Sequence, residues 1–186
     1  MNVDMTQTNT PSSTSPNQFP NRFTSRVSIC QANYADPLHA QAVVKLLDAY
    51  AQDPAGGGKA LAAFTKTHLV AELAARPQAF SVLAFDDHAP VGLVNCIEGF
   101  SSFACKPLIN VHDVAVLSSY RGQRVGEKML ALVEEIAVQR GACKLTLEVL
   151  TGNPSAIKLY ERIGFAGYQL DPAMGHAVFL QKWLEK

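Results

Sequence analysis

Apolar and polar residues follow two different periods along the chain, and these periods predict most of the secondary structure. Apolar, β-branched and aromatic residues with a two-residue period predict strands, whereas apolar residues three or four positions apart predict helices. The strand pattern occurs at 26–31, 80–85, 91–103, 108–117, 143–150, 165–170 and 177–183. The helix pattern occurs at 37–51, 59–75, 122–140 and 153–163. This order predicts a mixed α/β (α+β) fold with a mostly antiparallel sheet of about seven strands and about four helices.

Several local signals support the boundaries of these elements. Asn153 precedes Pro154 and predicts a helix start, because an Asn cap and a Pro in the first turn both favour that position. Gly141 and Gly164 predict helix ends. In the helix at 59–75, we expect one face to gather a set of largely apolar side chains: Leu61, Phe64, His68, Leu69 and Leu73.

The chain divides into a polar tail and one folded domain. Residues 1–24 are rich in Thr, Ser, Asn, Gln and Pro, and they offer too little apolar surface to fold, so we expect disorder there. Residues 25–186 form the expected single domain, since 48% of the 186 residues are hydrophobic and can build one sizeable core.

Charge and cysteine content narrow the partners and the location. Sixteen basic residues balance sixteen acidic ones, so the chain lacks the basic excess typical of nucleic-acid binders. Neither a secretory signal nor an apolar stretch long enough for a bilayer is seen, and we expect no membrane partner and a cytoplasmic location. The four cysteines form no CxxC pair and the histidines show no ligand spacing, so we predict no metal.

Residues 114–126 form a strand, a short turn with Arg and Gly, and the start of a long amphipathic helix. The first turn of a helix leaves backbone N–H groups unpaired at the positive end of its dipole, where they bind anions such as a diphosphate. Gly122 and Gly126 lack a Cβ, so a bulky ligand can approach the backbone closely. The spacing matches neither a Walker loop nor a dinucleotide fingerprint, and a purely structural turn is the alternative.

A second segment, residues 153–165, places three side chains on one helix stripe. Asn153, Ala156 and Tyr160 are spaced i, i+3 and i+7. The amide can bind a peptide-like cofactor arm, the small Ala leaves room for it, and the phenol can donate a proton to a leaving sulfur. The alternative is that Tyr160 is only a core residue of an amphipathic helix.

Together these two segments resemble the GNAT superfamily of N-acetyltransferases. Its cofactor motif is Q/R-x-x-G-x-G/A; Arg121 and Gly126 match the first and last positions, and Arg124 stands where the middle Gly is usual. We expect the Arg124 side chain to point to solvent or to a phosphate. The second motif, N-x-x-A-x-x-L-Y-x-x-x-G-F, is matched by Asn153, Ala156, Leu159, Tyr160, Gly164 and Phe165.

The resemblance implies a cofactor and roles for the matched positions. The fold would be a sheet splayed at its middle, with acetyl-CoA as cosubstrate between two parallel strands. The Val114 amide would bind the acetyl carbonyl and stabilise the oxyanion, and Val116 would pair with the pantetheine arm, with Ala115 between them. Tyr160 would protonate the thiolate or only hydrogen-bond it, and Asn153 would bind the arm beside Ala156. The pyrophosphate would be held by main-chain amides of Arg121, Gly122, Gln123, Arg124, Val125 and Gly126.

An amine nucleophile also needs a proton acceptor, and three acidic or basic side chains on two strands are candidates. We expect Glu98 to be the base, because a polar and aromatic segment with Phe100 follows it. His112 and Asp113 are the other candidates, and strand alternation predicts that they face opposite sides of the sheet. The expected acceptor site comprises Tyr34, Glu98, Phe100, His112 and Asp113.

These observations predict an enzyme that transfers an acetyl group from acetyl-CoA to a small-molecule primary amine in a ternary complex. One alternative is a non-catalytic acyl-CoA sensor or interaction module on the same fold. Another is a nucleotide- or phosphosugar-binding domain, which would leave the Asn153–Tyr160 stripe without a purpose. A homodimer formed by the final strands around Trp183 is left open.

Overall fold

The structure is a computed structural model that describes residues 27–168, 171, 173, 175 and 177–184. The expected polar tail, residues 1–24, lies outside this range. A five-stranded sheet runs in the order β1-β2-β3-β4-β5; its first four strands are antiparallel and β5 is parallel to β4. The strands are β1 (Val27–Gln31), β2 (Ala79–Asp86), β3 (Ala89–Ser101), β4 (Lys106–Val116) and β5 (Leu145–Leu147).

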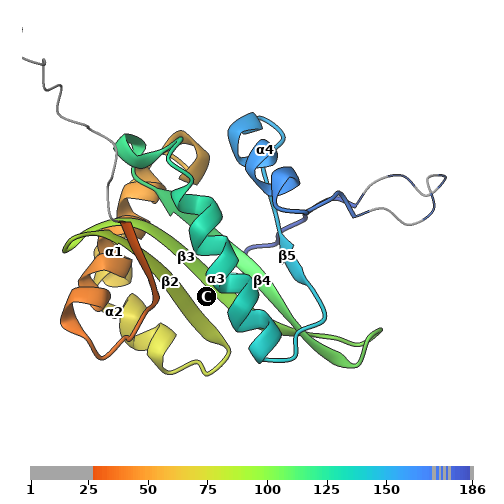
Figure 1. The fold of residues 1–186 in the computed structure, drawn as a ribbon, viewed down its shortest axis with the longest axis horizontal. Coiled ribbons are helices and arrows are strands. Elements are labelled where there is room, and N and C mark those ends of the chain that lie inside the picture. Colours follow the sequence, from red (N-terminus) through yellow and green to blue (C-terminus); the bar gives the residue numbers. More distant parts are fainter. Residues whose placement is uncertain (1–26, 169–170, 172, 174, 176, 185–186) are drawn as a thin grey trace, which may run out of the picture.

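Helices cover both faces of this sheet, as the mixed α/β prediction required (Figure 1). One apolar cluster joins α1 and α2 to Leu83, Leu93 and Ala115 of the sheet. The other joins α3, with α4 at its edge, to residues such as Val82 and Val94. The helical elements are α1 (Pro37–Gln52), η1 (Pro54–Gly56), α2 (Ala63–Ala74), η2 (Ser118–Tyr120), α3 (Val125–Gln139) and α4 (Pro154–Arg162).

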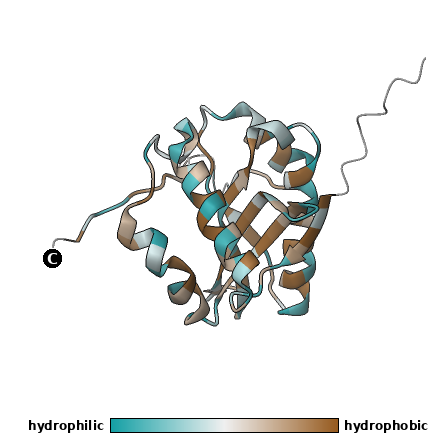
Figure 2. Ribbon diagram, turned by 90° about the vertical axis from the view of Figure 1, so that its left-hand side faces the viewer, coloured by the Kyte–Doolittle hydropathy of each residue, from teal (hydrophilic) through white to brown (hydrophobic). Residues whose placement is uncertain are grey.

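The hydropathy pattern explains this layering. Apolar residues dominate the central strands, while α3 carries hydrophobic residues on one side and hydrophilic residues on the other (Figure 2). Val125, Met129 and Val133 of α3, which belong to the amphipathic stripe expected from the sequence, are almost fully buried. Helices therefore cover both faces of the sheet, and polar residues in its central strands are exceptions to the apolar pattern.

A β-bulge in β4 changes which side chains face which layer. Asn95 pairs with Asp113 but Cys96 pairs with Val111, so His112 is the extra residue. Val111 and Val114 both pack on the α3 side, and His112 and Asp113 between them therefore both face the α1 side. The prediction that His112 and Asp113 face opposite sides was wrong, because simple alternation does not hold across a bulge.

The pairing of β4 with β5 is short. It covers Ile109–Val111 against Leu145–Leu147, and beyond it the two parallel strands have no ladder. The strand expected at 143–150 is therefore limited to three residues. The rest of β4, from His112 to Val116, keeps β3 as its partner on one side only. This is the splayed sheet that the family resemblance implied.

The outer surface of α2 also differs from expectation. The helix begins at Ala63, and its packed residues are Leu69, Val70 and Leu73. Phe64 is 71% exposed and stacks on the His68 ring at 4.1 Å between ring centroids, outside the core. The predicted face was therefore correct for its second half and wrong for Phe64 and His68, since the helix starts later than the pattern indicated.

The two closing strands expected near the C-terminus are not formed in the described residues. Residues 165–168 and 177–183 carry no strand assignment, and 169–170 lie outside the described range. Several large apolar side chains of this segment are at least three-quarters exposed: Val178, Phe179, Leu180, Trp183 and Leu184. The sheet described here consequently ends at β5, and the unpaired edge of β5 stays uncovered by a sixth strand.

Gly92 offers a test of how tightly α3 packs on the sheet. A Cβ at this position would lie 2.8 Å from Met129 Cε and 3.2 Å from Ala84 Cβ. Overpacking of this kind is destabilising, so Gly92→Ala should lower the free energy of unfolding by about 1–2 kcal/mol in urea denaturation. Gly99→Ala is the control, because its Cβ would make only ordinary contacts with Leu108. Equal losses in both variants would contradict the packing argument.

Candidate functional site

The turn between β4 and α3 is built by two residues with left-handed backbone. Gly122 has φ 78° and Arg124, the N-cap residue of α3, has φ 58° and ψ 21°. These conformations reverse the chain after η2 and delay the helix, which begins at Val125 and not at residue 122 as the pattern indicated. Left-handed residues next to a helix start direct successive N–H groups into a common concavity that suits an anion.

Five backbone N–H groups at this turn lack an acceptor within the part of the chain that the structure describes. The first bond into the helix is Lys128 N–H to Arg124 O at 3.0 Å, and no side chain caps the helix. Within the described residues, unpaired backbone N–H groups are those of Gly122, Arg124, Val125, Gly126 and Glu127. They point out at the positive end of the α3 dipole, so the turn is chemically suited to a phosphate or diphosphate.

Arg124 shows why glycine is usual at its position. A left-handed conformation costs a residue with a Cβ about 1–2 kcal/mol, whereas glycine adopts it freely. The Arg124 side chain is 73% exposed, and its Nη1 lies 3.8 Å from Glu127 Oε1. This exposure agrees with the expectation that the side chain points to solvent or to a phosphate, and the Arg124 backbone contributes to the concavity.

Arg121 connects the turn to the segment that follows α1. Its Nη2 lies 2.8 Å from Asp53 Oδ2, and its Nε donates to Val116 O at 3.1 Å. Asp53 is the C-cap residue of α1 and its side chain also caps η1 through Ala55 N. The Arg121 ion pair and this backbone bond hold the pKa of Asp53 below its usual value. One side chain thus links the end of β4 to the segment after α1.

Gly126 allows α3, α4 and β4 to approach one another. A Cβ there would lie 3.1 Å from Leu159 Cδ2 and 3.8 Å from Val116 Cγ2. Gly126 is buried in the first turn of α3, so α4 sits directly beside the unpaired N–H groups. The two sequence motifs, about thirty residues apart in the chain, are therefore in contact.

The free edge of β4 lies at the same place. Leu117 N–H donates to Val91 O at 3.0 Å, on the β3 side. Because successive residues of a strand direct their N–H groups to opposite edges, Val116 and Val114 point theirs toward β5. The β5 ladder has already ended at Val111, which leaves these groups with no strand partner within the described structure. They form an open edge that an extended amide-containing chain can pair with.

Helix α4 supplies the polar side chains of the second motif. Asn153 caps it, with Oδ1 accepting from Ala156 N at 3.2 Å and Ser155 Oγ at 2.9 Å. The Nδ2 group of Asn153 has no partner among the described residues and can donate to a ligand. Pro154 occupies the first turn and Gly164 follows the helix with φ 97°, both as predicted.

Tyr160 is 9% exposed and packs edge-on against Phe165, with 5.9 Å between ring centroids. Its hydroxyl has no hydrogen-bond partner in the described residues. Because no fully buried side-chain oxygen or nitrogen in those residues lacks a partner, this hydroxyl must be accessible to solvent. Burial, together with the charge of Tyr50, raises the pKa of Tyr160 to about 12. Tyr160 is therefore a protonated donor at any ordinary pH.

Tyr50 on α1 was not anticipated from the sequence, because a tyrosine at the end of an amphipathic helix resembles any core residue. Burial first, then the charges of Asp113 and Asp53, raise its pKa. Tyr50 is therefore within electrostatic reach of Asp113 on β4 and of Tyr160 on α4. Two buried polar residues, Ser81 and Asn95, also reach this region through Asp113, and they interrupt otherwise apolar strands in the sequence.

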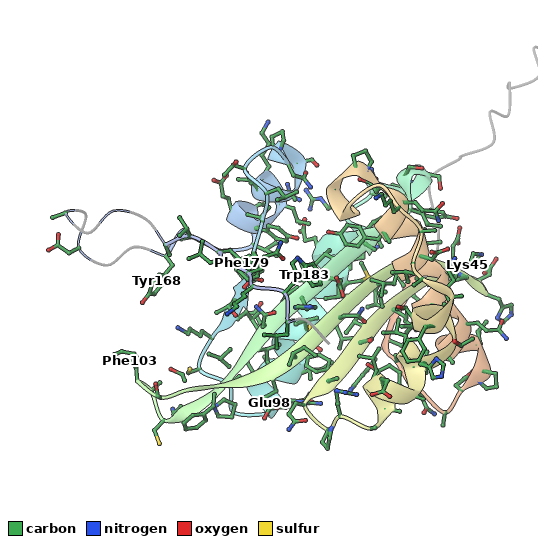
Figure 3. The ribbon with its side chains drawn as sticks, turned by 180° about the vertical axis from the view of Figure 1, so that it is seen from behind. Lys45, Glu98, Phe103, Tyr168, Phe179 and Trp183 are labelled. Carbon is green, nitrogen blue, oxygen red and sulfur yellow. The ribbon has the colours of Figure 1, made fainter. Side chains whose placement is uncertain are left out.

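Glu98 and Phe100 lie elsewhere. Glu98 pairs with Arg140 at the C-terminal end of α3, at 3.0 Å, on the α3 side of the sheet. In Figure 3 Glu98 lies at the end of the sheet opposite α4. In β3 it is four residues beyond Val94, the partner of Val114, or about 13 Å at 3.3 Å per residue. Phe100 is 64% exposed near the tip of the β3–β4 hairpin.

Of the remaining expected acceptor residues, His112 and Asp113 lie in the part of β4 that has the open edge, whereas Tyr34 contacts Ser81 on β2. Tyr34 packs on the α1-side cluster, Asp113 is half-buried beside Val114, and His112 is exposed next to Asn110. Among the described residues no group of three or more His, Cys, Asp or Glu side chains could hold a metal ion. In the same part of the chain, no helix has the length and apolarity needed to cross a bilayer.

The strain at Arg124 can be measured. Arg124→Gly should raise the free energy of unfolding by about 0.5 kcal/mol, or roughly 1–2 °C in Tm, because relief of the left-handed strain exceeds the entropic cost of glycine. Arg124→Ala is the matched control, since it removes the same exposed side chain but keeps a Cβ. Thermal unfolding should show a gain only for glycine; similar gains for both variants would assign the effect to the side chain.

Comparison with known proteins agrees with this geometry. Residues 42–165, about two thirds of the chain, match the Acetyltransferase (GNAT) family. Streptothricin acetyltransferase of Streptomyces lavendulae is 33% identical over 87 residues, 45% of this chain and 46% of that protein. N-alpha-acetyltransferase 30 of Schizosaccharomyces pombe is 30% identical over 91 residues, 48% of this chain and 59% of its own. The chain thus spans less than two thirds of these relatives.

Solved structures extend the similarity in fold. A probable acetyltransferase superposes with a TM-score of 0.71 at 22% identity, covering 85% of this chain and 99% of the other. The aminoglycoside N-acetyltransferase AAC(6')-Iy in complex with CoA gives 0.66 at 17% identity, covering 89% and 99%. The match over residues 42–165, which include both motifs and the splayed strands, shows that the chain belongs to the GNAT family of acetyltransferases.

Proposed function

We propose that this chain transfers an acetyl group from acetyl-CoA to the primary amine of a small-molecule acceptor, by direct attack in a ternary complex. The observation that carries the proposal is the set of unpaired main-chain donors along the end of β4 and the start of α3, beside helix α4, which carries Tyr160. A diphosphate and an amide-containing arm are the ligand chemistry that such donors fit.

The residues present suit acetyl-CoA as cosubstrate. The N–H groups of Gly122, Arg124, Val125, Gly126 and Glu127 would hold the pyrophosphate. The open edge at Val116 would pair with the pantetheine arm, and the free Nδ2 of Asn153 would donate to an arm carbonyl. Family membership and the CoA complex of a structural neighbour support this assignment.

The chemistry needs an oxyanion donor and a group that helps the sulfur leave. The amine nitrogen attacks the thioester carbonyl carbon, a C–N bond forms, and the C–S bond then breaks. The Val114 N–H, preorganised on the open edge of β4, would stabilise the oxyanion; one such donor is worth on the order of 3 kcal/mol. The thiolate leaves with a proton from Tyr160 or from solvent, and the amine gives its extra proton to a base.

The high pKa of Tyr160 favours one of its two expected roles. At about 12 it lies some 3–4 pK units above an ordinary thiol, so complete proton transfer to the thiolate is uphill. We therefore assign Tyr160 as a hydrogen-bond donor that stabilises the departing thiolate, with solvent completing the protonation.

Asp113 replaces Glu98 as the proposed proton acceptor. Its carboxylate is next to the oxyanion donor Val114 and within electrostatic reach of Tyr50, whereas Glu98 is committed to Arg140. Asp113 accepts a bond from Asn95 Nδ2 at 3.0 Å through one oxygen, and its other oxygen has no partner among the described residues. It can therefore bind an ammonium and take its proton, directly or through water.

The names of similar proteins support an amine acceptor and leave its structure open. They include streptothricin acetyltransferase, thialysine N-epsilon-acetyltransferase of Mus musculus and an aminoglycoside acetyltransferase in complex with sisomicin. The expected polar residues at the acceptor side, Tyr34, His112 and Asp113, are consistent with a small cationic amine.

Replacement of Tyr160 tests its role. Tyr160→Phe should lower kcat by about tenfold to a hundredfold, since one hydrogen bond to the leaving sulfur is lost, and should change the Kd for CoA less than twofold. Steady-state kinetics and calorimetry measure the two quantities. Because the Tyr160 pKa is about 12, its deprotonation should cause no loss of activity below about pH 11. Tyr168→Phe, at an exposed tyrosine, is the control. Equal losses in kcat and CoA affinity would reject the stabilising role.

An amine screen tests the function itself. Acetyl-CoA is incubated with thialysine, streptothricin, sisomicin and simple diamines, and release of free thiol is followed. Consumption of at least one amine, at a rate above hydrolysis by at least about tenfold, is the expected result. CoA binding without consumption of any amine would favour the acyl-CoA sensor and contradict the enzyme.

A further inference from the structure

Four polar side chains form a continuous hydrogen-bonded line across the sheet. The Tyr34 hydroxyl lies 2.8 Å from Ser81 Oγ, and Ser81 Oγ donates to Asn95 Oδ1 at 2.6 Å. Asn95 Nδ2 then donates to Asp113 Oδ2 at 3.0 Å. We call these residues, Tyr34, Ser81, Asn95 and Asp113, the polar line.

The strand register places the members of the polar line side by side. Ser81 on β2 pairs with Asn95 on β3, and Asn95 pairs with Asp113 on β4. All three face the α1 side, where their neighbours along the strands are apolar. The bulge at His112 is what brings Asp113 to this face, since without the extra residue the alternation of β4 would reverse.

Burial makes these polar residues costly, so their retention needs a reason. Ser81 is fully buried and Asn95 is 5% exposed, whereas Asp113 at the end of the line is only half-buried. Buried polar groups of this kind are satisfied by one another and rigidify the structure around them. An apolar pair at these two positions would build the same core with less penalty.

Every bond in the line is directed toward Asp113. The Ser81 hydroxyl uses its one hydrogen to donate to Asn95, so Tyr34 must donate to Ser81. Burial raises the pKa of Tyr34, which keeps its phenol protonated and able to donate. The line cannot carry a proton away from Asp113, since the Asn95 amide in its middle neither accepts nor releases one at ordinary pH. Its physical effect is to fix one carboxylate oxygen and leave the other free.

We infer that Tyr34, Ser81 and Asn95 are positioning residues that hold the Asp113 carboxylate in the orientation needed to bind and deprotonate the acceptor amine. This rests on the proposed function and adds to it the residues that set the geometry of the base. Tyr34, expected from the sequence to contact the acceptor, acts in this inference through the line.

The effect of Ser81→Ala should appear in the amine parameters alone. This variant keeps the size of the buried site and cuts the line between Tyr34 and Asn95. We expect kcat/KM for the amine to fall by about tenfold, because a misplaced catalytic group loses rate steeply with small displacements. The Kd for CoA should stay within twofold. Tyr34→Phe should act in the same direction, and Ser28→Ala, another serine on a strand, is the control.

A double-mutant cycle with Asp113→Ala separates positioning from general stability. If the line acts through Asp113, Ser81→Ala should cause no further loss of kcat/KM in the Asp113→Ala background. An equal loss in both backgrounds, or a parallel loss of CoA affinity, would overturn the inference. Tyr34→Phe in both backgrounds supplies the same comparison if Ser81→Ala fails to fold.

A binding readout keeps this test distinct from that of the proposed function. Calorimetric titration of the CoA-bound protein with each amine of the panel needs no turnover, and the same cycle can be completed for amine Kd. If amines bind and the cycle shows coupling while none is acetylated, the proposed function fails and the positioning of Asp113 for amine binding stands. If amines are acetylated and the cycle shows no coupling, the positioning fails and the function stands.

Discussion

The separation of β4 from β5 is the constraint on which the rest of the site depends. Backbone N–H and C=O groups inside a protein are normally paired, and a parallel ladder that stops at Val111 leaves the next part of β4 in need of a partner. The adjoining turn has the same deficit, because Gly122 and Arg124 set the chain so that the helix start has no cap. Both deficits lie on one continuous stretch of backbone, and a single extended anionic ligand can satisfy both.

The two faces of the sheet carry different kinds of residues near the candidate site. The α3 face is apolar, and Gly126 lets α4 approach there with its tyrosine. The α1 face carries the polar line and ends at Asp113. Val114 follows Asp113 in β4 and directs its N–H to the open edge of that strand. In the proposed mechanism, the donor to the leaving thiolate, the oxyanion donor and the base would thus come from three directions, from β4 and its two flanking layers.

The sequence was sufficient for the order of the helices and strands from β1 to α4, the capped α4 and the family, because these depend on local periodicity and on short motifs. Motif spacing also pointed to the anion-binding turn and to Tyr160. It did not reveal the ion pair of Glu98, because the partner Arg140 lies 42 residues away in sequence. Ser81 and Asn95 were visible as polar residues in apolar strands, but only the strand register shows that they meet. The late starts of α2 and α3 depended on individual backbone angles that periodicity does not report.

The extra residue at His112 has a consequence for how this protein is compared with others. Because of this one extra residue, side chains from Asp113 onward face the layer opposite to the one that simple alternation from Val111 would predict. A relative with an unbulged strand would align correctly only if a single gap were opened at 112. An ungapped alignment would equate residues from opposite layers, and a carboxylate at the position of Asp113 would then be mistaken for a core residue or the reverse.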